Sequence, residues 1–324
     1  MKKYLIVLTG PTGVGKTEVC LHLADFFKIP VINADSRQIF KEIPIGTAAP
    51  TPLQQSKAKH YFVGTHSIDD YYSASVYEEE AMRIIGEIHK TSDIALLSGG
   101  SMMYIDAVCN GIDYLPTIDD ATRNKMKIRL EEEGLDSLVN ELSILDPEYW
   151  EIVDRKNPRR VVHALEICHV SGKTYTSFRK NKKKPRPFSI IKIGLEIPRE
   201  TLYEKINKRV FQMFEQGLIN EALAVYPKRH LNSLNTVGFK ETFEYLDGLS
   251  TLEDTITRIQ NNTRKYARKQ ITWYKKDNDM RWFSPHNIEE ILKYISKQSL
   301  LDVKEVPLHI HNIHATYIIK GNSI

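Results

Sequence analysis

A glycine-rich segment near the N-terminus carries the residues best suited to bind a phosphate group. Residues 10–17, GPTGVGKT, match the pattern GxxxxGK[ST] at every fixed position. In such a loop the backbone N–H groups point at one anion, beside a helix N-terminus that favours negative charge. Lys16 would pair with the terminal phosphate, and the Thr17 hydroxyl would bind Mg²⁺. We therefore predict a diphosphate-binding loop formed by Gly10, Thr12, Gly13, Val14, Gly15, Lys16 and Thr17.

A carboxylate, Asp35, follows the second apolar run of the chain, residues 30–33. P-loop proteins that hydrolyse nucleotides usually place an acid after a strand to hold the metal. Here the run 93–98 leads into Gly99-Gly100-Ser101, with no acid. Asp35 could be a metal ligand or a base, because ligands collect at the carboxyl edge of open α/β sheets. It could equally form a turn or a helix N-cap. These residues alone predict an α/β protein that binds a diphosphate. Such a loop recognises the phosphate groups and not the whole nucleotide, so it does not identify the ligand as ATP.

The elements that must position these residues alternate along the first 110 residues, as βαβ units on a parallel sheet do. We predict strands at Tyr4–Thr9, 30–33, 93–98 and 188–196. We predict helices at Lys16–Phe27 and 77–90, and further helices between the last strand and about residue 276. Residues 119–172 are helical in pattern, with breaks at Asp146-Pro147 and Asn157-Pro158. The fold class predicted is α/β, with a nucleotide-kinase-like core of parallel sheet flanked by helices and a mostly helical insertion.

The predicted domain organisation is discontinuous. Residues 1–115 and 188–298 form the P-loop core, which ends in basic helices, and residues 116–187 form the insertion. A basic, proline-containing stretch at 180–187 is interpreted as a mobile loop. Residues 299–324 are predicted to be an appendage, and alternation around 308–319 favours a strand pair with exposed histidines over a metal site.

Composition is that of a globular protein, with 41% hydrophobic and 27% charged residues. No apolar stretch approaches the roughly 18 residues of a membrane span, and the apolar run at Tyr4–Thr9 is interpreted as a strand, not a signal peptide. The three widely spaced cysteines favour a reducing cytoplasm. We expect a monomer with no membrane partner.

Charge is segregated along the chain. Residues 65–120 hold 11 acidic and 2 basic residues, whereas residues 155–192 hold 1 acidic and 12 basic residues. Residues 255–284 are also basic, with 8 basic and 2 acidic residues. Such clusters suit a polyanion such as a nucleic acid, although a solvated charged face would look the same.

Several stretches together resemble the bacterial tRNA dimethylallyltransferase family, in order and in approximate spacing over residues 4–283. Besides the P-loop they are Asp35–Gln38 with 45–48, 98–104, Asn157–Arg160 with 164–166, Arg209-Val210 with Met213 and Gly217-Leu218, 237–241 and 267–273. A lone P-loop is shared by many unrelated enzymes, but this series is specific. The resemblance implies transfer of a dimethylallyl group from its diphosphate to the exocyclic amine of the adenosine 3′ to the tRNA anticodon, with release of diphosphate.

The resemblance also implies roles for individual residues. Asp35 would be the general base, the P-loop would bind dimethylallyl diphosphate with Mg²⁺ on Thr17, and Ser101 and Arg209 would complete the catalytic set. A base oriented on the amine would accept its proton as the C–N bond forms. Contacts to the tRNA anticodon stem-loop are expected from Asp35, Ser36, Arg37, Gln38, Ser101, Arg123, Arg159, Arg160, His163, Lys240, Arg264, Arg268 and Lys269. We expect Tyr266 and Trp273 to pack inward from the basic helix.

The chain departs from the family pattern at four positions. Ser101 stands where threonine is usual, His163 and Lys275 where arginine is usual, and Phe239 where tyrosine is usual. These changes put individual RNA contacts in doubt, but not the phosphate loop or Asp35. The alternatives are a prenyltransferase acting on free AMP, ADP or ATP, a small-molecule kinase, and a tRNA-binding protein without activity. The helical insertion favours tRNA over a free nucleotide.

Overall fold

A computed structural model describes residues 2–180 and 183–299 of the 324-residue chain. The chain forms two compact units. The first comprises residues up to Tyr72, Glu80–Ile105 and the described residues from Pro187 onward. The second comprises Ser73–Glu79 and Asp106–Arg186, so it starts earlier than the predicted insertion and includes a short upstream segment. Whether these units act as the domains predicted from the sequence stays a prediction.

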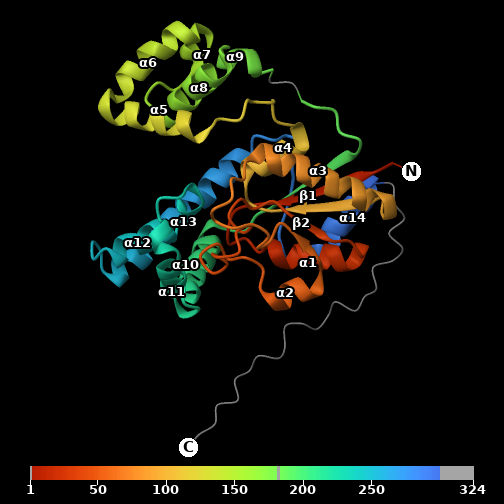
Figure 1. The fold of residues 1–324 in the computed structure, drawn as a ribbon. Coiled ribbons are helices and arrows are strands. Elements are labelled where there is room, and N and C mark those ends of the chain that lie inside the picture. Colours follow the sequence, from red (N-terminus) through yellow and green to blue (C-terminus); the bar gives the residue numbers. More distant parts are fainter. Residues whose placement is uncertain (1, 181–182, 300–324) are drawn as a thin grey trace, which may run out of the picture. The chain divides into compact units, whose positions relative to one another are not determined.

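The first unit is built on a six-stranded sheet in which every pair of neighbours is parallel, in the order β3-β2-β4-β1-β5-β6 (Figure 1). The strands are β1 (Tyr4–Thr9), β2 (Val31–Asn33), β3 (His60–Tyr61), β4 (Ile94–Ser98), β5 (Ser189–Leu195) and β6 (Arg281–Phe283). All residues of β1 and β4 are buried, as expected for central parallel strands covered on both faces. Because β1, β2 and β4 run in register, the loops that follow them open at one edge of the sheet.

The sheet is flanked by helices. The helices outside the helical insertion are α1 (Lys16–Phe27), α2 (Pro52–Lys57), α3 (Ala74–Thr91), α4 (Met102–Asn110), α10 (Arg199–Glu215), α11 (Leu218–Val225), α12 (Phe239–Leu246), α13 (Leu252–Tyr274) and α14 (Ile288–Ser299), with short 3-10 turns at Tyr226–Lys228 and Asn232–Leu234; α3 and α4 each have residues in both units. One face of β1, including Ile6 and Leu8, packs against side chains of α1, α10, α13 and α14 in a single apolar cluster. Figure 1 shows α3 on the opposite side of the strands from α1. None of the described helices is both long and apolar enough to span a membrane.

The second unit is mostly helical, with α5 (Asp120–Glu132), α6 (Gly134–Leu145), α7 (Pro147–Ile152), α8 (Pro158–Ser171) and α9 (Tyr175–Phe178). The two predicted breaks lie where proline starts a helix, because proline at the first helical position loses no hydrogen bond. The Asp146 and Asn157 side chains cap α7 and α8. A small apolar core, including Met126, Leu138 and Leu165, holds α5, α6 and α8 together.

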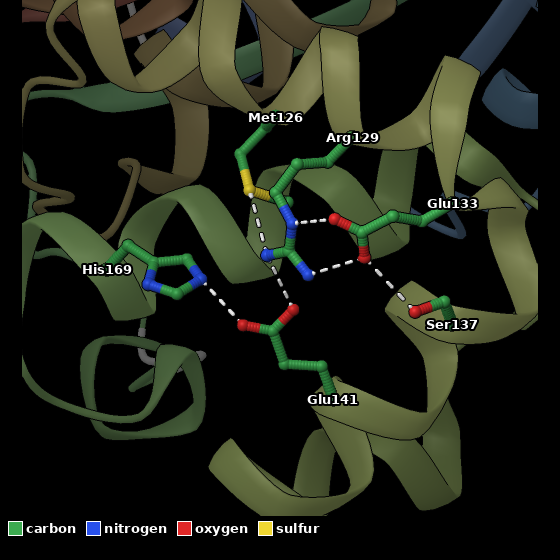
Figure 2. A network of polar contacts seen from close by, with 6 residues as sticks. All are labelled: Met126, Arg129, Glu133, Ser137, Glu141 and His169. Carbon is green, nitrogen blue, oxygen red and sulfur yellow. Dashed lines mark hydrogen bonds and ion pairs between the residues drawn. The ribbon is translucent and has the colours of Figure 1, made fainter.

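A polar network crosses the same helices (Figure 2). Arg129 on α5 pairs with Glu133 at 2.6 Å and with Glu141 on α6 at 2.7 Å. Glu141 also contacts Nε2 of His169 on α8 at 2.8 Å. Glu133 and Glu141 raise the pKa of Arg129, although burial acts in the opposite direction. The network therefore joins three helices through one carboxylate, Glu141.

Two chain segments of the second unit meet at a buried carboxylate, Glu78. Its Oε1 accepts from Arg186 at 2.8 Å and from Lys184 at 3.2 Å, while Oε2 accepts from the Ile112 N–H at 2.8 Å. Residues 183–186 form neither helix nor strand, as predicted for the stretch 180–187. The prediction that this stretch is mobile does not fit its described part, because two of its basic side chains are bound to Glu78.

The predicted strands and helices of residues 4–98 and 188–276 are confirmed. Elements outside the helical insertion that were not predicted include the helices α2, α4 and α14 and the strands β3 and β6, which are only two and three residues long. The prediction that Trp273 packs inward is wrong, because this residue is 43% exposed. Tyr266 is 37% exposed, but its hydroxyl points inward to the Gly100 carbonyl at 3.5 Å, so the prediction is met in part. The predicted strand pair and histidines of 308–319 lie outside the described residues.

Candidate active site

The glycine-rich loop leaves the end of β1 and starts α1. Gly15 is the N-cap of α1 and has φ of 105°, a left-handed conformation that glycine adopts without strain. The helix therefore begins at Lys16, and the N–H groups of its first turn lack intrahelical partners. This local geometry is the one predicted from the sequence, and it can hold an anion at the helix N-terminus.

Lys16 lies at the centre of this loop. Its ammonium group donates to the carbonyl oxygens of Gly10 and Pro11, at 3.0 and 2.9 Å. Burial lowers the pKa of Lys16 to about 8, while Asp35 acts to raise it and Arg209 to lower it. The three predicted charged groups of the site are thus close enough to influence one another.

Asp35 follows β2 and uses its two carboxylate oxygens differently. Oδ1 accepts from the backbone N–H groups of Arg37 and Gln38, at 3.0 and 3.3 Å, which makes the turn foreseen as one alternative. Oδ2 accepts no hydrogen bond from the described residues. It lies 3.9 Å from the position that a Cβ on Gly100 would occupy, and Lys16 Nζ lies 3.7 Å from the same point. The turn therefore holds one oxygen, and the other lies near the same point beside Gly100 as the Lys16 ammonium.

The loop after β4 carries no acid, in agreement with the sequence, and is fixed to the loop that carries Asp35. The Ala34 N–H donates to the carbonyl of Ser98 at 2.8 Å, and the Ser101 N–H donates to the carbonyl of Ala34 at 3.0 Å. A side chain at Gly99 would come within 2.2 Å of the Ala34 carbonyl oxygen, so glycine is needed there. Ser101 is buried at the start of α4.

Arg209 projects from α10, and its guanidinium makes no hydrogen bond or ion pair with any residue in 2–180 or 183–299. Burial lowers the pKa of Arg209, and Asp35 opposes that shift. A guanidinium has five N–H donors in a planar fork, which suits phosphate oxygens. Arg209 and Lys16 therefore offer two cations to an anion bound at the P-loop.

The predicted RNA-binding residues beside Asp35 already have protein partners. Arg37 donates from Nη1 to the carbonyls of Asn232 and Ser233, at 2.9 and 3.0 Å. Gln38 donates to the carbonyls of Thr47 and Ala48. Ser36 is partly buried between them. In the free protein Arg37 and Gln38 thus hold neighbouring loops around the site.

The basic residues of α12 and α13 are on the surface of the first unit. Lys240 and Lys269 are exposed, while Arg264 and Arg268 gather around the Tyr203 ring of α10. The Tyr203 hydroxyl accepts from Arg268 at 3.2 Å and from Arg199 at 3.0 Å. No carboxylate among the described residues pairs with any of these three arginines, so their positive charge remains available to an anion.

A shallow groove of about 420 Å³ follows one side of α13. It is lined by Lys265, Arg268, Lys269, Thr272, Trp273 and Lys276. Trp273 was expected in the core, but its position among four lysine and arginine side chains explains its exposure. Basic side chains beside an exposed aromatic ring are typical of surfaces that bind nucleic acid.

Four of the predicted RNA-binding residues belong to the second unit. Arg159 and Arg160 are exposed in the first turn of α8, and Arg123 is partly buried on α5. His163 packs edge-on against Tyr175 with ring centroids 5.8 Å apart. The exposed arginines can contact an external ligand, whereas part of the His163 ring is engaged within the unit.

No group of three or more His, Cys, Asp or Glu side chains in the described residues could hold a metal ion. A P-loop does not require such a group, because Mg²⁺ is usually held by one hydroxyl or carboxylate together with phosphate oxygens and water. Thr17 is the second residue of α1, beside Lys16. The residues present therefore fit Mg²⁺ that arrives with a diphosphate.

Sequence reasoning missed Gln270 on α13, which is 1% exposed. Its Oε1 accepts from the Thr12 N–H at 2.8 Å, and its Nε2 donates to the Gly100 carbonyl at 2.8 Å. A polar residue at helical spacing from the buried Ala267 and Tyr274 was the available signal. Gln270 lies within a stretch whose basic residues were predicted to bind RNA, and the polar residue among them was given no role of its own.

The fold and site define a class: an α/β protein whose P-loop can hold an anion next to a carboxylate, with no acid in the loop directly after β4. The chain belongs to the IPP transferase family, whose model matches residues 38–277.

Named relatives agree over most of the chain. It is 56% identical to tRNA dimethylallyltransferase 1 of Bacteroides fragilis, over 90% of this chain and 97% of the relative. It is 57% identical to tRNA dimethylallyltransferase 1 of Phocaeicola vulgatus, over 91% of this chain and 98% of the relative.

Solved structures show the same likeness. The tRNA isopentenylpyrophosphate transferase of Bacillus halodurans superposes with a TM-score of 0.68 and 32% identity, covering 92% of this chain and 97% of that one. A eukaryotic dimethylallyltransferase acting on tRNA gives a TM-score of 0.76 at 26% identity, covering 92% of this chain and 78% of that one. The predicted family and fold class are therefore confirmed.

Proposed function

We propose that this protein transfers a dimethylallyl group from dimethylallyl diphosphate to the exocyclic amine of the adenosine 3′ to the anticodon of tRNA. The observation that carries the proposal is that Lys16 Nζ and Asp35 Oδ2 both lie within 4 Å of the Cβ position of residue 100. An anion-binding group and a carboxylate oxygen that accepts no hydrogen bond from the described residues are thus close to the same point. The names of the relatives support tRNA as the acceptor and dimethylallyl as the group transferred.

The diphosphate would bind at the P-loop. The first-turn N–H groups of α1, Lys16 and Arg209 offer donors and positive charge to its oxygens, and Thr17 would hold Mg²⁺ together with them. As the allylic C–O bond breaks, negative charge accumulates on the leaving diphosphate. Donors that are already in place stabilise that charge, and Mg²⁺ would add to the same effect.

Asp35 would act on the other reactant. An adenine amine is a weak nucleophile, so it must be oriented and must lose a proton as the new C–N bond forms. Oδ2 would accept that proton, because Oδ1 is already bound by the N–H groups of Arg37 and Gln38. The products are then N6-dimethylallyladenosine in the RNA, diphosphate and one proton.

RNA binding would use the positive surfaces of both units. In the first unit these are Arg199, Arg264 and Arg268 around Tyr203, together with the groove on α13. In the second unit they are Arg159 and Arg160. The target base must leave its stack to reach Asp35, at a cost of about a few kcal/mol that such contacts would offset.

The test is to incubate the protein with unmodified tRNA, dimethylallyl diphosphate and Mg²⁺, then digest the RNA and identify the nucleosides by mass spectrometry. We expect dimethylallyladenosine at the position 3′ to the anticodon. A matched tRNA with guanosine at that position should remain unmodified. Modification of the guanosine tRNA, or of neither RNA, would contradict the proposal.

A further inference from the structure

We propose that Gln270 is a positioning residue that fixes the diphosphate loop to the loop after β4, which in turn is hydrogen-bonded to the loop of the general base. The proposal rests on the proposed function, since it assigns a task within that reaction. Gln270 projects from α13, far along the chain from Thr12 and Gly100, and its amide contacts one residue of the P-loop and one of the loop after β4. It is not a catalytic residue, because it reaches the reacting groups through the backbone.

The amide has a single orientation in this place. The Thr12 N–H can only donate, and the Gly100 carbonyl can only accept, at 2.8 Å each. Oε1 must therefore face Thr12 and Nε2 must face Gly100. Both bonds lie in an almost fully buried place, since Gln270 is 1% exposed. Such bonds compete little with water, and an unpartnered group there would be costly.

Each bond leads to one half of the site. Thr12 belongs to the P-loop whose carbonyls at Gly10 and Pro11 hold the Lys16 ammonium. Gly100 precedes Ser101, whose N–H binds the Ala34 carbonyl directly before Asp35. Gln270 thus connects the loop that would hold the diphosphate with the loop pair that holds the carboxylate.

The fit around Gly100 shows how closely the amide approaches. A Cβ at residue 100 would lie 2.7 Å from Gln270 Nε2, so any side chain there would displace the amide. The same point is 3.7 Å from Lys16 Nζ and 3.9 Å from Asp35 Oδ2. The two hydrogen bonds therefore lie close to Lys16, which would bind the diphosphate, and to Asp35, which would accept the proton. We expect the loss of either bond to change the distance between these two groups.

The test is the Gln270→Met variant, which keeps the length of the side chain but can make neither bond. Gln260→Met is the matched control, since Gln260 is on the same helix and makes one long hydrogen bond, 3.4 Å, to the Asn207 carbonyl. Kinetics are measured at a temperature where circular dichroism shows all proteins folded. Misplacement by about 1 Å can cost about 100-fold in rate, so we expect kcat to fall roughly 10- to 100-fold in Gln270→Met.

The pattern of constants separates positioning from a structural role. We expect the KM for dimethylallyl diphosphate and the Kd for inorganic diphosphate to rise, with the KM for tRNA unchanged. A smaller folded fraction would lower kcat without moving either KM, and that result would overturn the proposal, as would kinetics like those of Gln260→Met. The Kd for inorganic diphosphate needs no prenyl transfer, so the proposal can be tested even if the proposed function fails.

A second variant guards against failure of Gln270→Met to fold. Gln270→Glu keeps the size and the acceptor for the Thr12 N–H, but an ionised carboxylate cannot donate to the Gly100 carbonyl. We expect kcat to fall at least 10-fold. Wild-type kcat in Gln270→Glu would overturn the proposed role of the bond to Gly100.

Discussion

At the scale of single residues, the site depends on one aspartate whose two oxygens have different surroundings. The turn bonds to Oδ1 explain why an Asp-Ser pair follows β2, and the free Oδ2 explains how the same residue could act as a base. The two alternatives left open by the sequence are therefore compatible. Their combination means that the turn would orient the base.

A substitution can separate these two tasks. In Asp35→Asn the amide oxygen can still accept from the N–H groups of Arg37 and Gln38, but the group can no longer take up a proton. We expect turnover to fall about 10²- to 10⁴-fold, the usual range for a lost general base. Binding of inorganic diphosphate, followed by calorimetry, should persist. Near-normal turnover would remove Asp35 from the mechanism.

Lys16 predicts a pH dependence of diphosphate binding. Burial lowers its pKa from 10.5 to about 8 in the free protein, so its ammonium loses its proton as pH rises through about 8. Affinity for inorganic diphosphate should therefore weaken above that pH. Diphosphate itself titrates, so the measured quantity is the Kd of Lys16→Met divided by the Kd of wild type. This ratio should shrink as pH rises, and a ratio independent of pH from 6 to roughly 9.5 would contradict the assignment.

The same shift has a consequence for folding. Because the pKa is lower in the folded chain, the unfolded chain binds more protons between pH 8 and 10.5. The contribution of Lys16 to stability therefore becomes more favourable as pH rises through that window.

At the scale of elements, Glu78 binds Lys184 and Arg186 in the last segment of the second unit. Its carboxylate and the Arg186 guanidinium are each only 9% exposed at the side chain. Removing one partner of a buried pair leaves the other charge uncompensated. We expect Glu78→Ala to lower the free energy of unfolding by about 3–5 kcal/mol, measured by urea denaturation. The neighbouring Glu79 is exposed, so Glu79→Ala should be close to neutral, and equal effects of the two changes would refute the assignment.

The pH dependence of the Glu78 contribution follows from its partners. Burial acts to raise its pKa, but hydrogen bonds from Arg186 and the Ile112 N–H hold the pKa below the usual 4.5. A lowered carboxylate pKa stabilises the folded state above the unfolded pKa, and this stability is lost as pH falls through the folded pKa. The difference between wild type and Glu78→Ala should therefore narrow below pH 4.5.

Local sequence signals explain which elements could be predicted. Residues 10–17 and the apolar strands β1 and β4 have patterns that depend on neighbours in the chain. In contrast, β3 and β6 are two or three residues long and form only by pairing with β2 and β5. Gln270 was missed for the same reason, since its task depends on Thr12 and Gly100, which are more than 160 residues away in the chain.

At the scale of the whole molecule, the segregated charge predicts how RNA binding responds to salt. Arg268 lies both at Tyr203 and in the groove on α13. Loss of one phosphate contact should weaken tRNA binding and reduce the slope of log K against log salt by about 1. Arg268→Ala should therefore show this change with an unaltered Kd for diphosphate.

A matched arginine provides the control for that experiment. Arg83 is exposed on α3, within the acidic stretch of residues 65–120, and makes no ion pair with any described residue. Arg83→Ala removes the same charge and should leave both the affinity and the salt slope unchanged. If both variants reduce the slope equally, the effect reflects net charge and not a contact at Arg268.

The central claim is prenyl transfer to tRNA, and its most direct test is a competition between acceptors. Radiolabelled dimethylallyl diphosphate and Mg²⁺ are supplied with unmodified tRNA and, in parallel, with AMP, ADP and ATP. We predict label in the tRNA alone. Label in the free nucleotides in place of tRNA would keep the chemistry at Asp35 but contradict the substrate, and label in none of them would contradict the reaction itself.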